Sequence, residues 1–259
     1  YIPVKSDTNQ VFPLVVMIHG GSYLTGDKDW LSPSCEVLQN SGFVVSSIDY
    51  RLGWREPGSF YDEMTTLAHA AYRGMQDANA ALRFLAAHAG EYGIDTNWIF
   101  LGGESAGASI ALNGSYTTDD DIETNNPELA QKLGKLNTSG NEYAKTYTIK
   151  GISNKWGAIS DSNLIYPGKA IPVISFHGVN DMLVPSEQGY FLGCETMPAY
   201  GSSCIYRRLL SAGSASVLYL KEDAGHMPVE FTPEFTMVKT AEFFNHIIRG
   251  TATSSIHYQ

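Results

Sequence analysis

The sequence lacks any apolar run long enough to cross a membrane. Its longest run, around Phe12 to Ile18, falls far short of the about 18 residues that such a span needs. Basic residues are also scarce and unclustered, and the formal charge is −10. A chain with this net charge and without a basic patch does not attract a phosphate backbone. We therefore do not expect nucleic acid as a partner.

Cysteine is rare as well, with three residues in the chain. Cys194 and Cys204 enclose a short segment rich in glycine, proline and serine, which either closes as a small disulfide loop or holds two free thiols near a helix boundary. A disulfide favours a secreted or periplasmic protein. Without one, the expected localisation is cytoplasmic. Cys35 is expected to be a small buried hydrophobe.

What the sequence has in quantity is apolar residues, which make up 43% of its 259 positions. Short apolar runs alternate with helical segments, and this alternation predicts an α/β fold with a mainly parallel sheet covered by helices on both faces. One apolar stripe at helical spacing predicts a long crossover helix through Leu67, Met75 and Leu82. The predicted strands are residues 14–18, 43–48, 98–101, 148–153, 172–176 and 216–220.

A single domain over residues 1–259 is expected, with a polar, acidic insertion at about 117–147. The insertion carries one helical signal, at Leu129, Leu133 and Leu136, which Asn126 would cap and Pro127 would begin. It is either a small lid above the sheet or a solvated surface excursion.

The two ends of the chain carry weaker signals. The first residues, YIPV, resemble the end of a strand, so an edge strand or hairpin is expected before them. They hold no charged and apolar leader pattern, and any signal peptide is expected to have been removed. At the other end, His257 is expected to be mobile.

The strongest local motif is G-E-S-A-G at residues 103–107, directly after a predicted strand and before a helical run. Small residues around Ser105 permit the sharp strand–turn–helix that holds a serine hydroxyl in a strained, accessible position. Ser105 is therefore the candidate nucleophile.

A serine needs a base that is itself held by an acid. Asp181 and His226 each follow a predicted strand, in the order that this arrangement requires. Asp161, after the preceding strand, is the alternative acid. Among the other histidines, His177 is expected to support the Asp181 loop, and none has so suitable a place for the base.

Acyl transfer also needs donors aimed at the developing oxyanion. His19 to Tyr23 read H-G-G-S-Y after the first predicted strand, where glycines let backbone amides approach a substrate carbonyl. The expected donors are the N–H groups of Gly21, Ser22 and Ala106. His19 is expected to organise the loop.

With HGGSY, DYRLG, YRGMQDANAALRFL, GGESAG, HGVND and AGHMP in this order, the chain resembles bacterial carboxylesterases and lipases of the α/β-hydrolase superfamily over nearly its whole length. The resemblance implies a serine carboxylesterase that needs no cofactor or metal and acts on a small-molecule ester. Relatives also include feruloyl, acetyl-xylan and polyester esterases. A serine peptidase of the same fold, or a binding protein that has lost catalysis, are the competing interpretations. The oligomeric state is left open.

The insertion bears on the substrate. It is acidic and poor in large apolar residues, whereas a lid for interfacial activation needs an apolar face. We therefore expect hydrolysis of soluble esters with short-to-medium acyl or small aromatic groups. Tyr23, Trp54 and Trp156 are either walls of a compact pocket or ordinary core residues.

Overall fold

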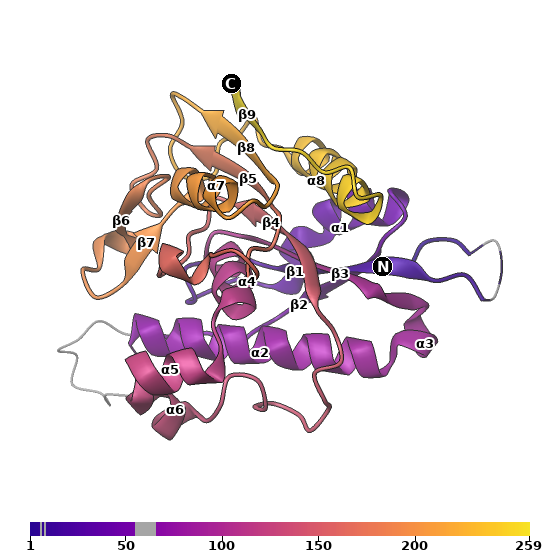
Figure 1. Cartoon of the computed structure of the whole chain (residues 1–259), viewed down its shortest axis with the longest axis horizontal. Coiled ribbons are helices and arrows are strands. Elements are labelled where there is room, and N and C mark those ends of the chain that lie inside the picture. Colours follow the sequence, from indigo (N-terminus) through magenta and orange to yellow (C-terminus); the bar gives the residue numbers. More distant parts are fainter. Residues whose placement is uncertain (6, 8, 55–65) are drawn as a thin grey trace.

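The computed structural model describes residues 1–5, 7, 9–54 and 66–259, and a seven-stranded sheet lies at its centre (Figure 1). Every neighbouring pair of strands is parallel. The predicted parallel sheet is confirmed, including its six predicted strands. In spatial order the strands are β2 (Val44–Ile48), β1 (Phe12–Ile18), β3 (Ile94–Glu104), β4 (Ile149–Lys155), β5 (Val173–Gly178), β8 (Ser216–Lys221) and β9 (Ser255–Tyr258).

Strand β1 explains why both faces of the sheet are apolar. Leu14 and Val16 belong to one buried cluster, and Val15 and Met17 to the other, because successive side chains of a strand point to opposite faces. Helices cover both clusters, as predicted. The first lies under α2 (Leu67–Ala87), α4 (Ala106–Tyr116) and α7 (Ser202–Ser211), and the second under α1 (Ser32–Asn40) and α8 (Pro233–Ile248).

The C-terminal end of the chain differs from expectation. His257 lies in the edge strand β9 and stacks on Tyr219 with ring centroids 4.5 Å apart, so the prediction of a mobile end is wrong. Pairing with β8 orders this segment, and its short apolar pattern does not reveal that pairing. At the other end, Tyr1 alone exchanges two backbone hydrogen bonds with Val45 of β2, and residues 1–5 form no strand.

The insertion contains two helices rather than one, α5 (Asp119–Asn125) and α6 (Pro127–Leu133). Thr118 and Asp121 form a capping box at α5, and the acidic first turn suits the positive end of the helix. Helix α6 begins at Pro127 as predicted, but the Asn126 side chain makes no cap hydrogen bond.

The insertion is fastened to α2. The Tyr72 hydroxyl donates to the Gly134 carbonyl at 2.8 Å, and the Gln76 side chain donates to the Leu133 carbonyl at 2.8 Å. The segment therefore extends the helical layer beside α2 (Figure 1).

The three cysteines are free thiols, with Cys35 buried as expected. Cys194 Sγ lies 3.1 Å from Thr196 Oγ1, and Cys204 Sγ lies 3.6 Å from a Glu187 oxygen. Of the two alternatives for Cys194 and Cys204, the structure has the free thiols, so export has no support from a disulfide and stays a prediction. Within the described ranges, no helix is long and apolar enough to cross a membrane.

Candidate active site

Ser105 stands in the turn between β3 and α4, as the motif predicts. Its backbone has φ 53° and ψ −117°, a strained conformation for a residue with a side chain. The turn also needs a small residue at Gly107, where an added Cβ would lie 2.1 Å from the Ile18 carbonyl oxygen. The glycine therefore lets α4 pass close to the end of β1 and fixes the direction of the turn.

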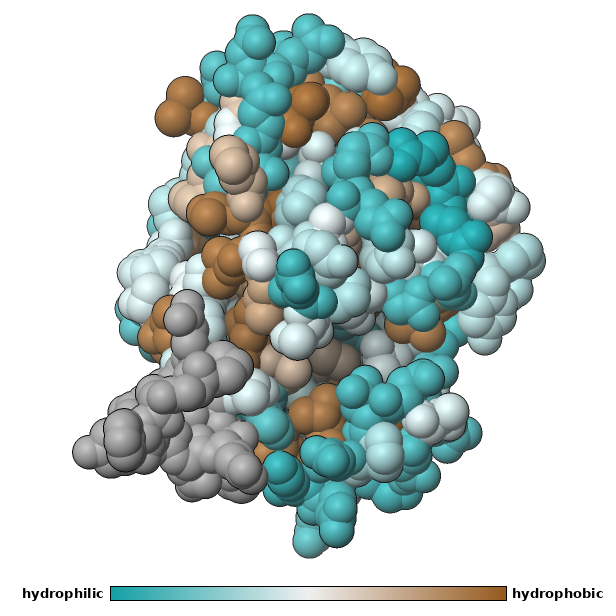
Figure 2. Space-filling model, turned by 90° about the vertical axis from the view of Figure 1, so that its left-hand side faces the viewer, coloured by the Kyte–Doolittle hydropathy of each residue, from teal (hydrophilic) through white to brown (hydrophobic). Residues whose placement is uncertain are grey.

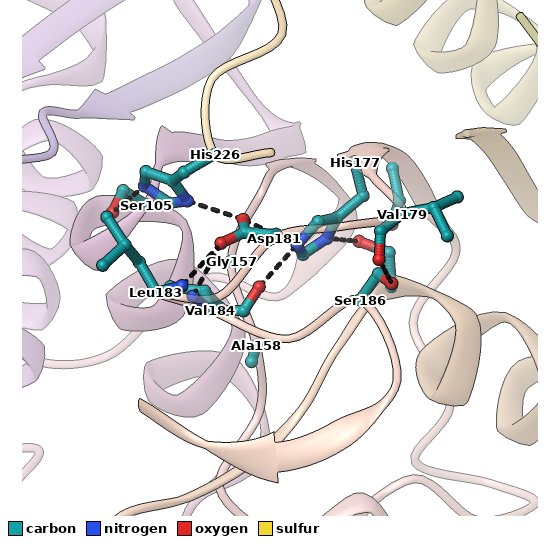
Figure 3. A network of polar contacts seen from close by, with 12 residues as sticks. Ser105, Gly157, Ala158, His177, Val179, Asp181, Leu183, Val184, Ser186 and His226 are labelled. Carbon is teal, nitrogen blue, oxygen red and sulfur yellow. Dashed lines mark hydrogen bonds and ion pairs between the residues drawn. The ribbon is translucent and has the colours of Figure 1, made fainter. Parts of the chain in front are cut away.

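The structure brings Ser105, His226 and Asp181 together at the carboxyl ends of three strands (Figure 3). His226 Nε2 lies 2.9 Å from Ser105 Oγ, and His226 Nδ1 lies 2.6 Å from Asp181 Oδ2. Asp181 follows β5 and His226 follows β8. A chain of this geometry can move a proton from the hydroxyl to the imidazole while the carboxylate holds the ring.

Asp181 is held from several sides. Its side chain is fully buried, and its Oδ1 accepts hydrogen bonds from the Leu183 and Val184 amides, both at 2.9 Å. Burial by itself raises the pKa of this carboxyl. Hydrogen bonds from His177, His226 and Val184 outweigh burial and hold the pKa of Asp181 well below its ordinary value. The carboxylate therefore stays ionised beside His226.

His177, at the end of β5, supports the acid directly (Figure 3). Its Nε2 faces two acceptors, the Val184 carbonyl at 2.9 Å and Asp181 Oδ2 at 3.2 Å, so this nitrogen carries the proton. Its Nδ1 lies 2.6 Å from the Ser202 hydroxyl, which donates to it. His177 thus fixes both Asp181 and the turn that follows. It lies beside the Asp181 loop, as the sequence predicts.

The glycine-rich loop packs on the serine turn. An added Cβ at Gly20 would lie 3.3 Å from Ser105 Cβ and 3.1 Å from the Glu104 carbonyl oxygen, so a side chain here would crowd the serine turn. His19 stacks on Tyr50 with centroids 4.5 Å apart, and its Nδ1 lies 2.7 Å from the Gly20 carbonyl. Through these contacts His19 holds the glycine-rich loop, which is the role expected of it.

The three expected oxyanion donors lie on the two backbone segments that meet here. Gly21 and Ser22 have positive φ angles of 104° and 54°, which turn the loop sharply. The Trp54 indole N–H donates to the Ser22 carbonyl at 2.8 Å and holds that turn. Ala106 is the first residue of α4, where a backbone N–H has no acceptor within the helix.

The alternative acid is placed differently. Asp161 begins the short 3-10 helix η2 (Ser162–Leu164), and its Oδ1 accepts the Asn163 amide at 2.8 Å. Of the two acids weighed from the sequence, the structure joins Asp181 to His226. Among the described residues, no group of three or more His, Cys, Asp or Glu side chains is placed to hold a metal ion.

Two contacts near the site were not predicted. Lys155, buried at the end of β4, pairs with Glu104 at 2.5 Å, next to the nucleophile. Trp156 is 3% exposed and packs against His226, with ring centroids 6.4 Å apart. The signal for the ion pair was the charged residue inside G-E-S-A-G, which needs a partner on a neighbouring strand.

Curated relatives match one part of the chain. Esterase E4 of Myzus persicae is 33% identical over 112 residues, which are 43% of this chain and 19% of that protein. A probable isoprenylcysteine alpha-carbonyl methylesterase of Arabidopsis thaliana is 32% identical over 111 residues, again 43% of this chain and 20% of the relative. The chain thus matches about a fifth of the length of these relatives.

Solved structures match nearly all of it. An esterase of Thermogutta terrifontis, solved with butyrate bound, has a TM-score of 0.66 at 20% identity and covers 98% of this chain and 90% of that one. A truncated carbohydrate esterase from gut microbiota has a TM-score of 0.65 at 17% identity, with 95% and 89% covered. These likenesses confirm the α/β-hydrolase fold. The BD-FAE family model matches residues 1–162, more than half of the sequence, and the chain therefore belongs to the BD-FAE family.

Proposed function

We propose that the protein is a carboxylic ester hydrolase that works through Ser105, His226 and Asp181. The observation that carries this proposal is the continuous contact from Ser105 Oγ through the His226 ring to Asp181, at 2.9 and 2.6 Å. The esterase names among its relatives and structural neighbours support the reaction type.

The reaction has two halves. Ser105 Oγ attacks the ester carbonyl carbon while His226 Nε2 takes its proton, and Asp181 stabilises the imidazolium that forms. The amides of Gly21, Ser22 and Ala106 would donate to the oxyanion. His226 then gives its proton to the leaving alcohol, and the serine ester that remains is hydrolysed by a water that His226 deprotonates.

The proposed substrates are esters of short-to-medium acyl or small aromatic acids. Steady-state hydrolysis of p-nitrophenyl butyrate tests this directly, since a structural neighbour was solved with butyrate. We expect Ser105→Ala to abolish turnover. Ser115→Ala, on the same helix, is the matched control and should leave turnover intact, because among the described residues the Ser115 hydroxyl hydrogen-bonds only to the Ala111 carbonyl of that helix. Equal activity of wild type and Ser105→Ala would refute the proposal.

A further inference from the structure

A cavity of about 320 Å³ lies beside the serine turn without reaching Ser105. Its floor consists of Ser109 and Asn113 on one face of α4 and of Thr117 directly after that helix, which follow Ser105 at intervals of four residues. The cavity therefore extends away from the nucleophile along the helix for about 12 Å, at 1.5 Å per residue.

The walls of the cavity come from segments distant in sequence. Helix α2 contributes Ala71 and Met75, and α5 of the insertion contributes Ile122. Figure 2 looks onto this side of the molecule, where hydrophobic residues gather between hydrophilic surfaces. The cavity lining is mainly apolar but includes the carboxylates of Asp121 and Asp161, and the cavity volume lies at the lower end of the about 300–1,000 Å³ typical of ligand pockets.

Tyr23 stands between the cavity and the serine turn. It follows the expected oxyanion donors in the glycine-rich loop, lines the cavity, and is 2% exposed. Its ring packs between Tyr50 and Phe191, with centroid distances of 6.3 and 5.6 Å. Burial raises the pKa of its hydroxyl, and a hydrogen bond with the Ser109 side chain opposes part of that rise. The side chain thus crosses the face of α4 one turn beyond Ser105.

The position of His226 decides which part of an ester faces this cavity. The leaving alcohol must receive its proton from His226, so the alcohol lies on the His226 side of Ser105. Among the described residues that line the cavity, none comes from the loop of His226, whereas Phe191 and Met197 belong to the segment that follows Asp181. The cavity borders the glycine-rich loop through Tyr23, and this is the side to which we assign the acyl group of the substrate.

We propose that Tyr23 sets the acyl-chain limit of the enzyme by closing a mainly apolar cavity that otherwise accepts the end of a straight-chain acyl group. The wild-type substrates are then esters of short acids, whose acyl chains end before Tyr23. This inference rests on the proposed ester hydrolysis and narrows it to one substrate class.

The test is the acyl-length profile of Tyr23→Ala with p-nitrophenyl esters from acetate to octanoate. Wild type should favour acetate and butyrate. In Tyr23→Ala the ratio of kcat/KM for octanoate to that for acetate should rise at least about tenfold, because several methylenes gain an apolar site. Tyr23→Phe keeps the ring and is the matched control, with a ratio close to that of wild type.

Two further measurements test where the longer acyl chain binds and which part of the ester occupies the cavity. Adding Ala71→Phe to Tyr23→Ala refills the cavity and should return the ratio toward wild type. Along a series of alkyl acetates, which lengthens the alcohol instead, Tyr23→Ala should leave the preference unchanged. Because Tyr23 has φ 60°, Tyr23→Gly provides the same opening without backbone strain if the alanine variant does not fold.

Several outcomes overturn the inference. A wild type that prefers octanoate would mean that the cavity is already open to Ser105. A loss of the same size at every acyl length in Tyr23→Ala would reduce Tyr23 to a support of the loop, and a gain along the alcohol series would assign the cavity to the alcohol. Failure of the proposed function looks different, since wild type would then hydrolyse none of these esters.

Discussion

The loops that follow β4 and β5 each present an aspartate, and the two residues differ in almost everything else. Asp181 is fully buried and held by two amides and two histidines. Asp161 is partly exposed and caps a single turn of 3-10 helix. An acid at the end of a strand is therefore not by itself a triad acid. The hydrogen-bond donors around Asp181 separate the two.

The largest expected effect divides these two residues. Asp181→Asn should lower kcat by about 10⁴, because the amide neither stabilises the imidazolium nor keeps the required tautomer. Asp161→Asn is the matched control and should stay within about threefold of wild type, since it has no contact with the imidazolium. Steady-state kinetics on p-nitrophenyl butyrate measures both, and a larger loss from Asp161→Asn would reverse the assignment.

A smaller effect is expected at His177, which acts through Asp181. His177→Leu removes one hydrogen bond to a charged group, worth about 1.5–3 kcal/mol, and should lower kcat by about 10- to 100-fold with little change in KM. His177→Gln keeps a donor and an acceptor and should recover part of the loss. If the two variants lose activity equally, the hydrogen bond to Asp181 does not cause the loss of kcat.

The lowered pKa of Asp181 also predicts a pH dependence of stability. A carboxyl whose folded-state pKa lies below its unfolded value stabilises the fold above that unfolded value, about 4, and loses this contribution as the pH falls through the folded pKa. The difference in free energy of unfolding between wild type and Asp181→Asn should therefore be largest above about pH 4 and shrink below it. Urea unfolding at pH 7 and pH 3 measures it, and a gap that widens in acid would contradict the account.

The smallest effect is expected at the loop after β4, which carries Asp161. Asp161→Ala removes the hydrogen bond to the Asn163 amide and should destabilise the fold by about 1 kcal/mol, as loss of a helix cap does. Chemical denaturation gives this value. A stability equal to that of wild type would show that the cap contributes nothing.

The sequence predicted those parts of the molecule in which local pattern and chemistry coincide. Ser105 was found because a nucleophile turn needs glycines on both sides, and β1 because its apolar run is continuous. Strand β9 was missed because pairing with β8, rather than apolar pattern, orders it. Helix α5 was missed because a capping box and charge stabilise it without an apolar stripe.

Contacts across the fold explain the rest of what could not be predicted. The ion pair of Lys155 and Glu104 joins neighbouring strands whose residues are 51 apart in the chain. The cavity beside Tyr23 arises where α2, α4 and α5 meet, and no single segment contains its outline. Such features depend on how the elements pack, which spacing along one chain does not reveal.

The central claim is that Ser105 is the activated nucleophile, and covalent labelling tests it most directly. The protein is treated with a fluorophosphonate, and the adduct is located by peptide mapping and mass spectrometry. The account predicts one stoichiometric adduct on Ser105, formed in wild type and in Ser115→Ala but strongly slowed in Asp181→Asn. An adduct on another residue, or none on a folded protein, would contradict it.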